Sequence, residues 1–201
     1  MAKRDHSKQV IGLCGAIGSG KSLVRKCIEV LWEVPTYDCD HQAKQLYHEP
    51  TVRRQITALV GFDPIRPDGS LDKCKLREAL ATDKEGIEKI VHTALFAHLT
   101  DWIEQQPYAT VVIESALLFT SGLYHFCTRT IAVLCDDNKR MERVLSRNPD
   151  LSDKDFAQID RLQTEERTLL QTNADYHLYN NEKESIITQL ETIYNQVTRN
   201  S

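Results

Sequence analysis

The sequence predicts an α/β protein in which helices cover both faces of a parallel sheet. Short apolar stretches of β type recur between longer helical stretches, and this alternation is typical of doubly wound α/β folds. Three of these stretches, residues 9–14, 110–115 and 129–135, are almost continuously apolar, as expected of strands buried on both faces. The chain has 201 residues, 41% of them hydrophobic, which is enough for one large domain with a sizeable core.

The predicted elements follow in order along the chain. Strands are expected at residues 9–14, 34–38, 110–115, 129–135 and 176–180, the last with the weakest pattern. Helices are expected at 22–32, 40–48, 51–60, 71–81, 85–105, 138–146, 153–172 and 182–198. The segment from about 40 to 105 holds several helical patterns and no convincing strand, so it predicts a helical insertion suited to substrate specificity. Residues 147–156 are polar and charged, which fits a mobile lid and an inert surface loop equally well.

Composition excludes several classes of protein. A net charge of −4 gives no electrostatic footprint for nucleic acid or an anionic membrane surface. No apolar run approaches the ~18 residues of a membrane span, and no signal sequence is recognisable, so a cytoplasmic location is expected. The six cysteines are scattered without Cys-x-x-Cys pairs, which favours reduced, buried thiols over a zinc site or a disulfide framework.

A glycine-rich loop follows the first predicted strand. Its pattern, Gly15-x₄-Gly20-Lys21-Ser22, lies between a strand and an amphipathic helix, which is the context of a P-loop. Glycines let consecutive N–H groups surround a β-phosphate; Lys21 would reach the β- and γ-phosphates and Ser22 would ligate Mg²⁺. The alternative is a glycine-rich turn without a ligand. The predicted nucleotide-binding residues of the loop are Gly15, Gly18, Ser19, Gly20, Lys21 and Ser22.

The motif predicts a P-loop NTPase core, with three α/β/α layers, that binds a nucleoside triphosphate and Mg²⁺. A GTPase would carry an Asn-Lys-x-Asp guanine reader, but Asn138-Lys139 is followed by Arg140 and Met141. ATP is therefore the expected nucleotide.

Two carboxylates follow the second predicted strand. If the chain is still extended there, Asp38 and Asp40 point to the same side at the carboxyl end of the sheet, where ligands bind. One of them could then accept a proton from a substrate hydroxyl, and the other could hold the metal through water. Equally, Asp40 could serve only as a helix N-cap.

Glu114 ends the third predicted strand, at the position of a Walker-B acid, which orients Mg²⁺ or its water shell. The alternative is a carboxylate that caps the next turn through Ser115.

Three arginines share one face of a later predicted helix. Arg140, Arg143 and Arg147 are spaced three and four residues apart, so they could clamp phosphates. A charged helix face is more often solvated or ion-paired, here with Glu142. A functional role is favoured for Arg143 and Arg147, because they adjoin the predicted lid.

Six segments together resemble the dephospho-CoA kinase family, from Val10 to about Asn181. They are "IGLCGAIGSGKS", "VPTYDCD", "DGSLDKCKLREAL", "IEKIVH", "VVIESALLF" and "NADYHLYNN". The resemblance implies a build like that of nucleoside monophosphate kinases, with a core at about 9–40, 108–146 and 173–201. It further implies an acceptor-binding helical insertion at about 41–107 and a lid at about 147–172.

The resemblance also implies residue roles. Asp40 would be the general base on the acceptor's ribose 3′-hydroxyl, residues 18–23 including Leu23 would hold ATP, and lid arginines such as Arg147 would steady the phosphates. Asp38, Leu76, Arg77, His92 and Glu114 would contribute to substrate binding. The implied reaction converts ATP and dephospho-CoA into ADP and CoA, with Mg²⁺ as cofactor and a monomer as a plausible state. The alternatives are a P-loop kinase of another nucleotide or small hydroxyl substrate, and a regulatory module that binds nucleotide without transfer.

Four positions depart from the family pattern. Leu23 replaces a threonine, so a hydroxyl near the α-phosphate is lost while the N–H remains. Thr93 replaces the proline after His92, which could alter a helix start. Glu114 replaces an aspartate with one extra methylene, and the lid arginine expected at Ile159 is absent. Its substitute would be Arg161 or Arg167.

Overall fold

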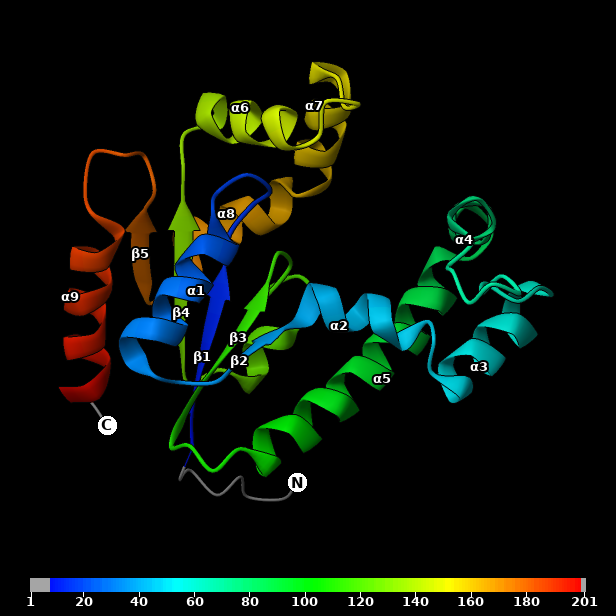
Figure 1. Ribbon diagram of the computed structural model, residues 1–201, viewed down its shortest axis with the longest axis horizontal. Helices are drawn as coiled ribbons and strands as arrows, with labels where there is room; N and C mark the ends of the chain where they lie inside the picture. Colours follow the sequence, from blue (N-terminus) through cyan, green and yellow to red (C-terminus); the bar gives the residue numbers. More distant parts are fainter. Residues whose placement is uncertain (1–7, 200–201) are drawn as a thin grey trace. The chain divides into compact units, whose positions relative to one another are not determined.

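The computed structural model describes residues 8–199 (Figure 1). These residues form two compact units, one comprising the chain up to Tyr37 and from Gln106 onward, the other comprising Asp38–Gln105. The first unit contains the sheet, and the second is the helical segment that the sequence predicts at about 41–107. Each unit is described by itself below.

A five-stranded sheet forms the centre of the first unit, with the strand order β2-β3-β1-β4-β5. β1 pairs in parallel with β3 and β4, and β4 pairs in parallel with β5. The predicted parallel α/β fold is therefore confirmed. The strands are β1 (Gln9–Cys14), β2 (Thr36–Asp38), β3 (Thr110–Ser115), β4 (Arg129–Leu134) and β5 (Tyr176–Tyr179).

Helices α1 (Lys21–Trp32) and α9 (Ile186–Arg199) cover one face of the sheet (Figure 1). Their apolar stripes pack on alternate strand residues, because neighbouring residues of a strand face opposite ways. Ile11 and Leu13 of β1 point to this side and are fully buried. The α1 and α9 members of this core are Val24, Ile28, Trp32, Leu190, Ile193 and Val197.

In the same unit, the segment that follows β3 packs against helix α8 (Thr164–Asn173). A buried carboxylate, Glu166, accepts hydrogen bonds from the backbone N–H groups of Phe119 and Thr120 at 3.0 and 2.8 Å. The 3₁₀ turn η1 (Leu123–Phe126) lies in this segment and was not expected from the sequence.

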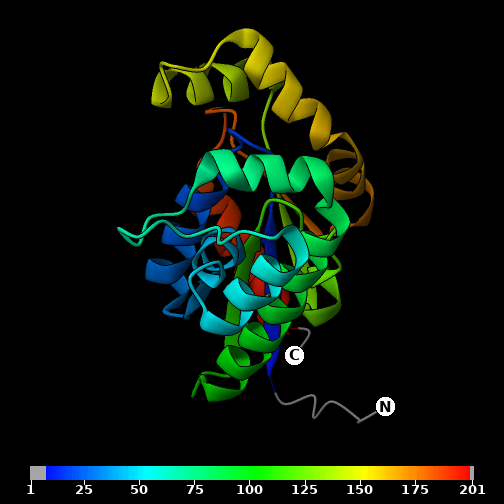
Figure 2. The ribbon, with the colours of Figure 1, turned by 90° about the vertical axis from the view of Figure 1, so that its right-hand side faces the viewer.

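The predicted helix over 153–172 is two helices, α7 (Asp153–Leu162) and α8, which meet at Gln163. Gln163 leaves the helical conformation with φ −100° and ψ 9°, and its N–H bonds back to Asp160 and Arg161 carbonyls in a tight turn. Figures 1 and 2 show α7 beside α6 (Asp137–Arg147). Ser152 starts α7 with a reciprocal capping box to Asp155, so within the polar stretch 147–156 only residues 148–152 lie outside helices.

The second unit is built on helix α5 (Lys84–Gln105), which α2 (Cys39–Leu46), α3 (Pro50–Val60) and α4 (Lys73–Thr82) all contact. α5 buries a stripe with a spacing of four residues, Ile87, Val91, Leu95 and Leu99. Asp72 caps α4 through the N–H groups of Cys74 and Lys75.

Within residues 8–199, no helix is both long and apolar enough to cross a membrane. All six cysteines are free thiols. The expectation that they are buried is confirmed for Cys14 and Cys39, whereas Cys27, Cys127 and Cys135 are partly exposed and Cys74 is exposed.

Gly12 provides a test of the packing behind β1. A Cβ atom there would lie 2.6 Å from Cys127 Sγ and 2.7 Å from Leu118 Cδ2. We expect Gly12→Ala to lower the free energy of unfolding in urea by about 1–3 kcal/mol through overpacking. Adding Cys127→Ala should recover part of this loss, whereas unchanged stability of Gly12→Ala would show that the space is not filled.

Candidate functional site

The loop between β1 and α1 depends on two glycines in the left-handed region. Gly18 has φ 78° and Gly20 has φ 88°, a conformation that other residues adopt at a cost. A side chain at either position would also collide with a neighbour, the Arg140 carbonyl at Gly18 and the Asn180 amide at Gly20. Glycine at both positions therefore lets the chain follow a path on which its N–H groups can face an anion.

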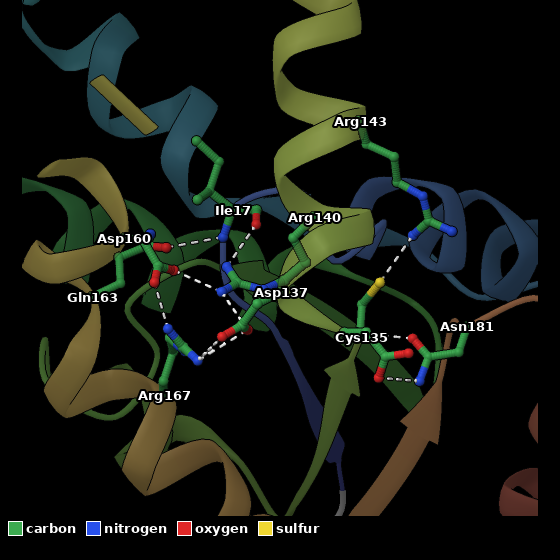
Figure 3. A network of polar contacts seen from close by, with 10 residues as sticks. Ile17, Cys135, Asp137, Arg140, Arg143, Asp160, Gln163, Arg167 and Asn181 are labelled. Atoms are coloured by element: carbon green, nitrogen blue, oxygen red, sulfur yellow. Dashed lines mark hydrogen bonds and ion pairs between the residues drawn. The ribbon is translucent and has the colours of Figure 1, made fainter. Parts of the chain in front are cut away.

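Three polar side chains from distant parts of the sequence hold this loop. Gln163 Oε1 accepts a hydrogen bond from Ile17 N at 2.9 Å, and Arg140 Nη1 donates to Ile17 O at 3.1 Å (Figure 3). Asn180 Nδ2 donates to Ser19 O at 2.8 Å in a buried contact. Gln163 and Asn180 are not among the predicted site residues. The sequence offers two signals for Asn180: it directly follows β5, at the sheet edge where ligands bind, and it lies in "NADYHLYNN", one of the six segments that carry the family resemblance.

Helix α1 begins directly behind the loop. Its N-cap, Gly20, has no side chain to bond the first-turn N–H groups, and the first turn contains no acidic residue. Such a helix start carries partial positive charge and attracts phosphate. The Leu23 N–H, a predicted nucleotide-binding group, donates to Gly20 O at 3.0 Å within the first turn.

The carboxylate of Glu114 lies where β3 ends and is only 1% exposed. Lys21 Nζ lies 2.6 Å and Ser22 Oγ 3.0 Å from its Oε1 atom. Arg25 Nε lies 2.5 Å from Oε2 as an ion pair that lacks hydrogen-bond geometry. The turn after β3 is closed by Ser115, whose hydroxyl accepts from Leu117 N at 3.1 Å, so capping of that turn by Glu114 is wrong.

The oxygen atoms of Ser22 and Glu114 fit a magnesium site. Both are hard ligands, and the two atoms lie 3.0 Å apart beside the loop. Mg²⁺ in nucleotide sites takes its other ligands largely from phosphates and water, so one hydroxyl and one carboxylate suffice on the protein side. Lys21, in contact with the same carboxylate, provides the positive charge that a phosphate would require.

The Arg140 side chain is buried within a network of charged side chains rather than on a solvated helix face. Its side chain is 2% exposed, and its Nη2 donates to Asp137 at 2.9 Å and to Asp160 at 2.7 Å (Figure 3). Arg167 bonds the same two carboxylates, Asp160 at 2.5 Å and Asp137 at 3.0 Å. The hydrogen bond from Arg140 lowers the pKa of Asp137 from its usual value. The network therefore ties α6, α7 and α8 to the loop carbonyl of Ile17.

The other arginines of this region lie apart from that network. Arg143 Nη2 donates to Asn180 O at 3.1 Å and its Nη1 contacts Cys135 Sγ at 3.3 Å. Arg147, at the end of α6, and Arg161, near the end of α7, are exposed. Arg161 and Arg167 are the two substitutes for the lid arginine that is absent at position 159. Only Arg167 belongs to the network described above.

In the helical unit, the strand ends at Asp38 and helix α2 begins at Cys39. The expected extended spacing of Asp38 and Asp40 is therefore wrong, since Asp40 lies in the first helical turn. The N-cap is Asp38, whose Oδ1 accepts from His41 N at 2.8 Å, so the assignment of the cap to Asp40 is also wrong.

The remaining predicted acceptor residues lie on α4 and α5. Leu76 is half-buried and Arg77 is exposed on α4. His92 stacks on Phe96 with ring centroids 6.3 Å apart. Thr93 lies well inside α5, which begins at Lys84, so the replacement of proline by Thr93 alters no helix start.

Comparisons with known proteins agree with this geometry. A family model described as dephospho-CoA kinase matches residues 9–185. The dephospho-CoA kinase of Porphyromonas gingivalis is 31% identical over 191 residues, covering 93% of each chain. The solved structure of TT1252 from Thermus thermophilus matches with a TM-score of 0.78 at 24% identity, over 96% of this chain and 98% of that one. A dephospho-CoA kinase structure from Campylobacter jejuni matches with a TM-score of 0.65 at 18% identity, over 96% of this chain and 98% of that one.

Asn180 provides a test of how the loop is held. Removing its amide leaves the buried Ser19 carbonyl unsatisfied, so we expect Asn180→Ala and Asn180→Asp to lower the free energy of unfolding by about 1–3 kcal/mol. ATP binding, measured by calorimetry, should weaken in both variants because the loop is less fixed. Asn173→Ala, at an exposed end of α8, is the control and should change neither quantity. Unaltered ATP binding in both Asn180 variants would contradict this role.

Proposed function

The chain belongs to the dephospho-CoA kinase family, and we propose that it transfers the γ-phosphoryl group of ATP to the ribose 3′-hydroxyl of dephospho-CoA. This is the last step of coenzyme A synthesis. The observation that carries the proposal is the convergence of Lys21 and Ser22 on the buried Glu114 beside a loop whose glycines hold left-handed conformations. A phosphate-binding loop of this kind, placed next to a metal-binding acid, serves phosphoryl transfer.

The phosphate-binding residues would act by position and charge. Residues 15–20 would surround the β-phosphate with N–H groups, and Lys21 would hold the β- and γ-phosphates. Ser22 would ligate Mg²⁺ directly, and Glu114 would hold it directly or through water. Bound Mg²⁺ would neutralise charge on the transferred group. Arg143 and Arg147 are the proposed arginine contacts with the phosphates. Arg147 begins the lid, residues 147–172, which would exclude water from the reaction.

The acceptor would be bound by the helical unit. Asp40 is the proposed general base, which takes the proton of the 3′-hydroxyl while the phosphoryl group is transferred. Asp38, which caps the start of α2, is proposed to contribute to binding of the same acceptor. Leu76, Arg77 and His92 are the proposed contacts with the remainder of dephospho-CoA.

A cytoplasmic location and a monomeric state are parts of the same proposal. The free thiols at all six cysteines support a reducing compartment.

Acceptor choice distinguishes this function from that of a related kinase. We expect ADP release with dephospho-CoA to exceed that with AMP, CMP or shikimate by orders of magnitude in kcat/KM, because only dephospho-CoA joins a free ribose 3′-hydroxyl to the pantetheine arm that the helical unit is proposed to bind. The measurement is a coupled ADP assay with each acceptor at the same concentration. Faster turnover of a mononucleotide would assign another substrate, and ATP binding without acceptor-dependent ADP would indicate a regulatory module.

Asp40→Asn tests the base. Because an amide cannot accept the proton, kcat should fall by about 10²–10⁴-fold, while ATP affinity measured by calorimetry stays the same. Asp38→Asn is the matched control for folding, since asparagine caps a helix as well as aspartate does. Normal turnover by Asp40→Asn would refute the assignment of the base.

A further inference from the structure

Each carboxylate oxygen of Glu114 has a cation of its own. Lys21 and Ser22 both contact Oε1, at 2.6 and 3.0 Å, whereas Arg25 contacts Oε2 at 2.5 Å. All three residues belong to the first two turns of α1 and approach the carboxylate from the same helix. Arg25 belongs neither to the glycine loop nor to any group that the proposed function assigns.

The Arg25 guanidinium is fixed independently of Lys21. Its Nη1 atom contacts Glu29 Oε1 at 2.6 Å and Thr36 Oγ1 at 3.0 Å, and the Thr36 hydroxyl also bonds Glu29. The side chain of Arg25 is 19% exposed. Glu29 on α1 and Thr36 on β2 therefore hold the guanidinium through Nη1, whereas Glu114 is contacted by Nε.

The two cations of Glu114 differ in what nucleotide binding requires of them. Lys21 is proposed to turn from the carboxylate to the phosphates when the nucleotide binds with Mg²⁺. The metal would then balance the charge of this carboxylate, which is 1% exposed, but only while the carboxylate keeps the orientation that the metal requires. A second cation that remains in place keeps that orientation, whereas nucleotide binding without Mg²⁺ does not depend on it.

We infer that Arg25 is a positioning residue that holds the Glu114 carboxylate in place when Lys21 turns to the phosphates, and that it thereby sets the affinity for the Mg²⁺-bound nucleotide. The inference rests on the proposed function for the roles of Lys21 and Glu114. Arg25 acts only through Glu114. Its removal should therefore weaken binding of nucleotide with Mg²⁺ and leave metal-free nucleotide binding unchanged.

Calorimetric titration of the full chain with ATP, once with Mg²⁺ and once with EDTA, tests this directly. We expect Arg25→Met to weaken Mg²⁺–ATP binding about 10–100-fold, as is usual when a partner of a metal-binding group is removed. Binding in EDTA should be unchanged. Lys26→Met removes the same charge from an exposed neighbouring position on α1 and should match the wild type in both titrations.

The Glu114→Gln background separates positioning from a general effect of charge. Arg25→Met should add no further loss of Mg²⁺–ATP binding there, because the group through which Arg25 acts has lost its charge. An equal loss with and without Mg²⁺, or the full loss in the Glu114→Gln background, would overturn the inference. If Arg25→Met fails to fold by circular dichroism, Arg25→Gln is titrated in its place, with the same expected and contradicting results.

The readout is independent of the acceptor. A chain that shows this Mg²⁺-specific loss but does not phosphorylate dephospho-CoA would refute the proposed acceptor and leave the role of Arg25 standing. A chain that phosphorylates dephospho-CoA but shows no Mg²⁺-specific loss in the Arg25 variants would confirm the acceptor and refute the role of Arg25.

Discussion

The structure depends above all on the loop between β1 and α1, whose backbone must hold left-handed conformations so that its N–H groups can face an anion. Gly18 and Gly20 make the path possible because they adopt positive φ without a steric cost. The path is held by hydrogen bonds from outside the loop, to Ile17 from two side chains and to Ser19 from one. Binding an anion then requires little further ordering of the loop, and such preorganisation is the main means of catalysis in phosphoryl transfer.

A second constraint follows from the negative charge of Glu114, which lies next to that loop. Glu114 is almost completely buried, so its charge must be compensated in every state of the catalytic cycle. Lys21 and Arg25 together provide that compensation, and both come from the helix whose N-terminus faces the loop. The proposed phosphate and metal binding and the balance of charge are thus organised by β1, α1 and β3, two strands of one parallel sheet and a helix that covers it.

The sequence predicts those parts of the molecule whose causes are local. Continuous apolarity identified the central strands, and the glycine–lysine–serine pattern placed a loop between β1 and α1, because burial on two faces and positive φ each leave a mark on neighbouring residues. The parts missed have tertiary causes. The helix break at Gln163 accompanies a contact with Ile17, and Asn180 is recognisable only once β5 has been placed beside β4. The second strand ended at Asp38 as predicted, but Asp38 capped a helix that began at Cys39, so the extended spacing considered for Asp38 and Asp40 is absent.

The central claim, that a preformed loop directs a phosphoryl group to a sugar hydroxyl, is tested most directly by identifying the product. The chain is incubated with ATP, Mg²⁺ and dephospho-CoA, and the products are separated and analysed by mass spectrometry and phosphorus NMR. The account predicts ADP and CoA in equal amounts, with the new phosphate on the ribose 3′ position. ADP with unchanged dephospho-CoA, or a phosphate at another hydroxyl, would contradict it.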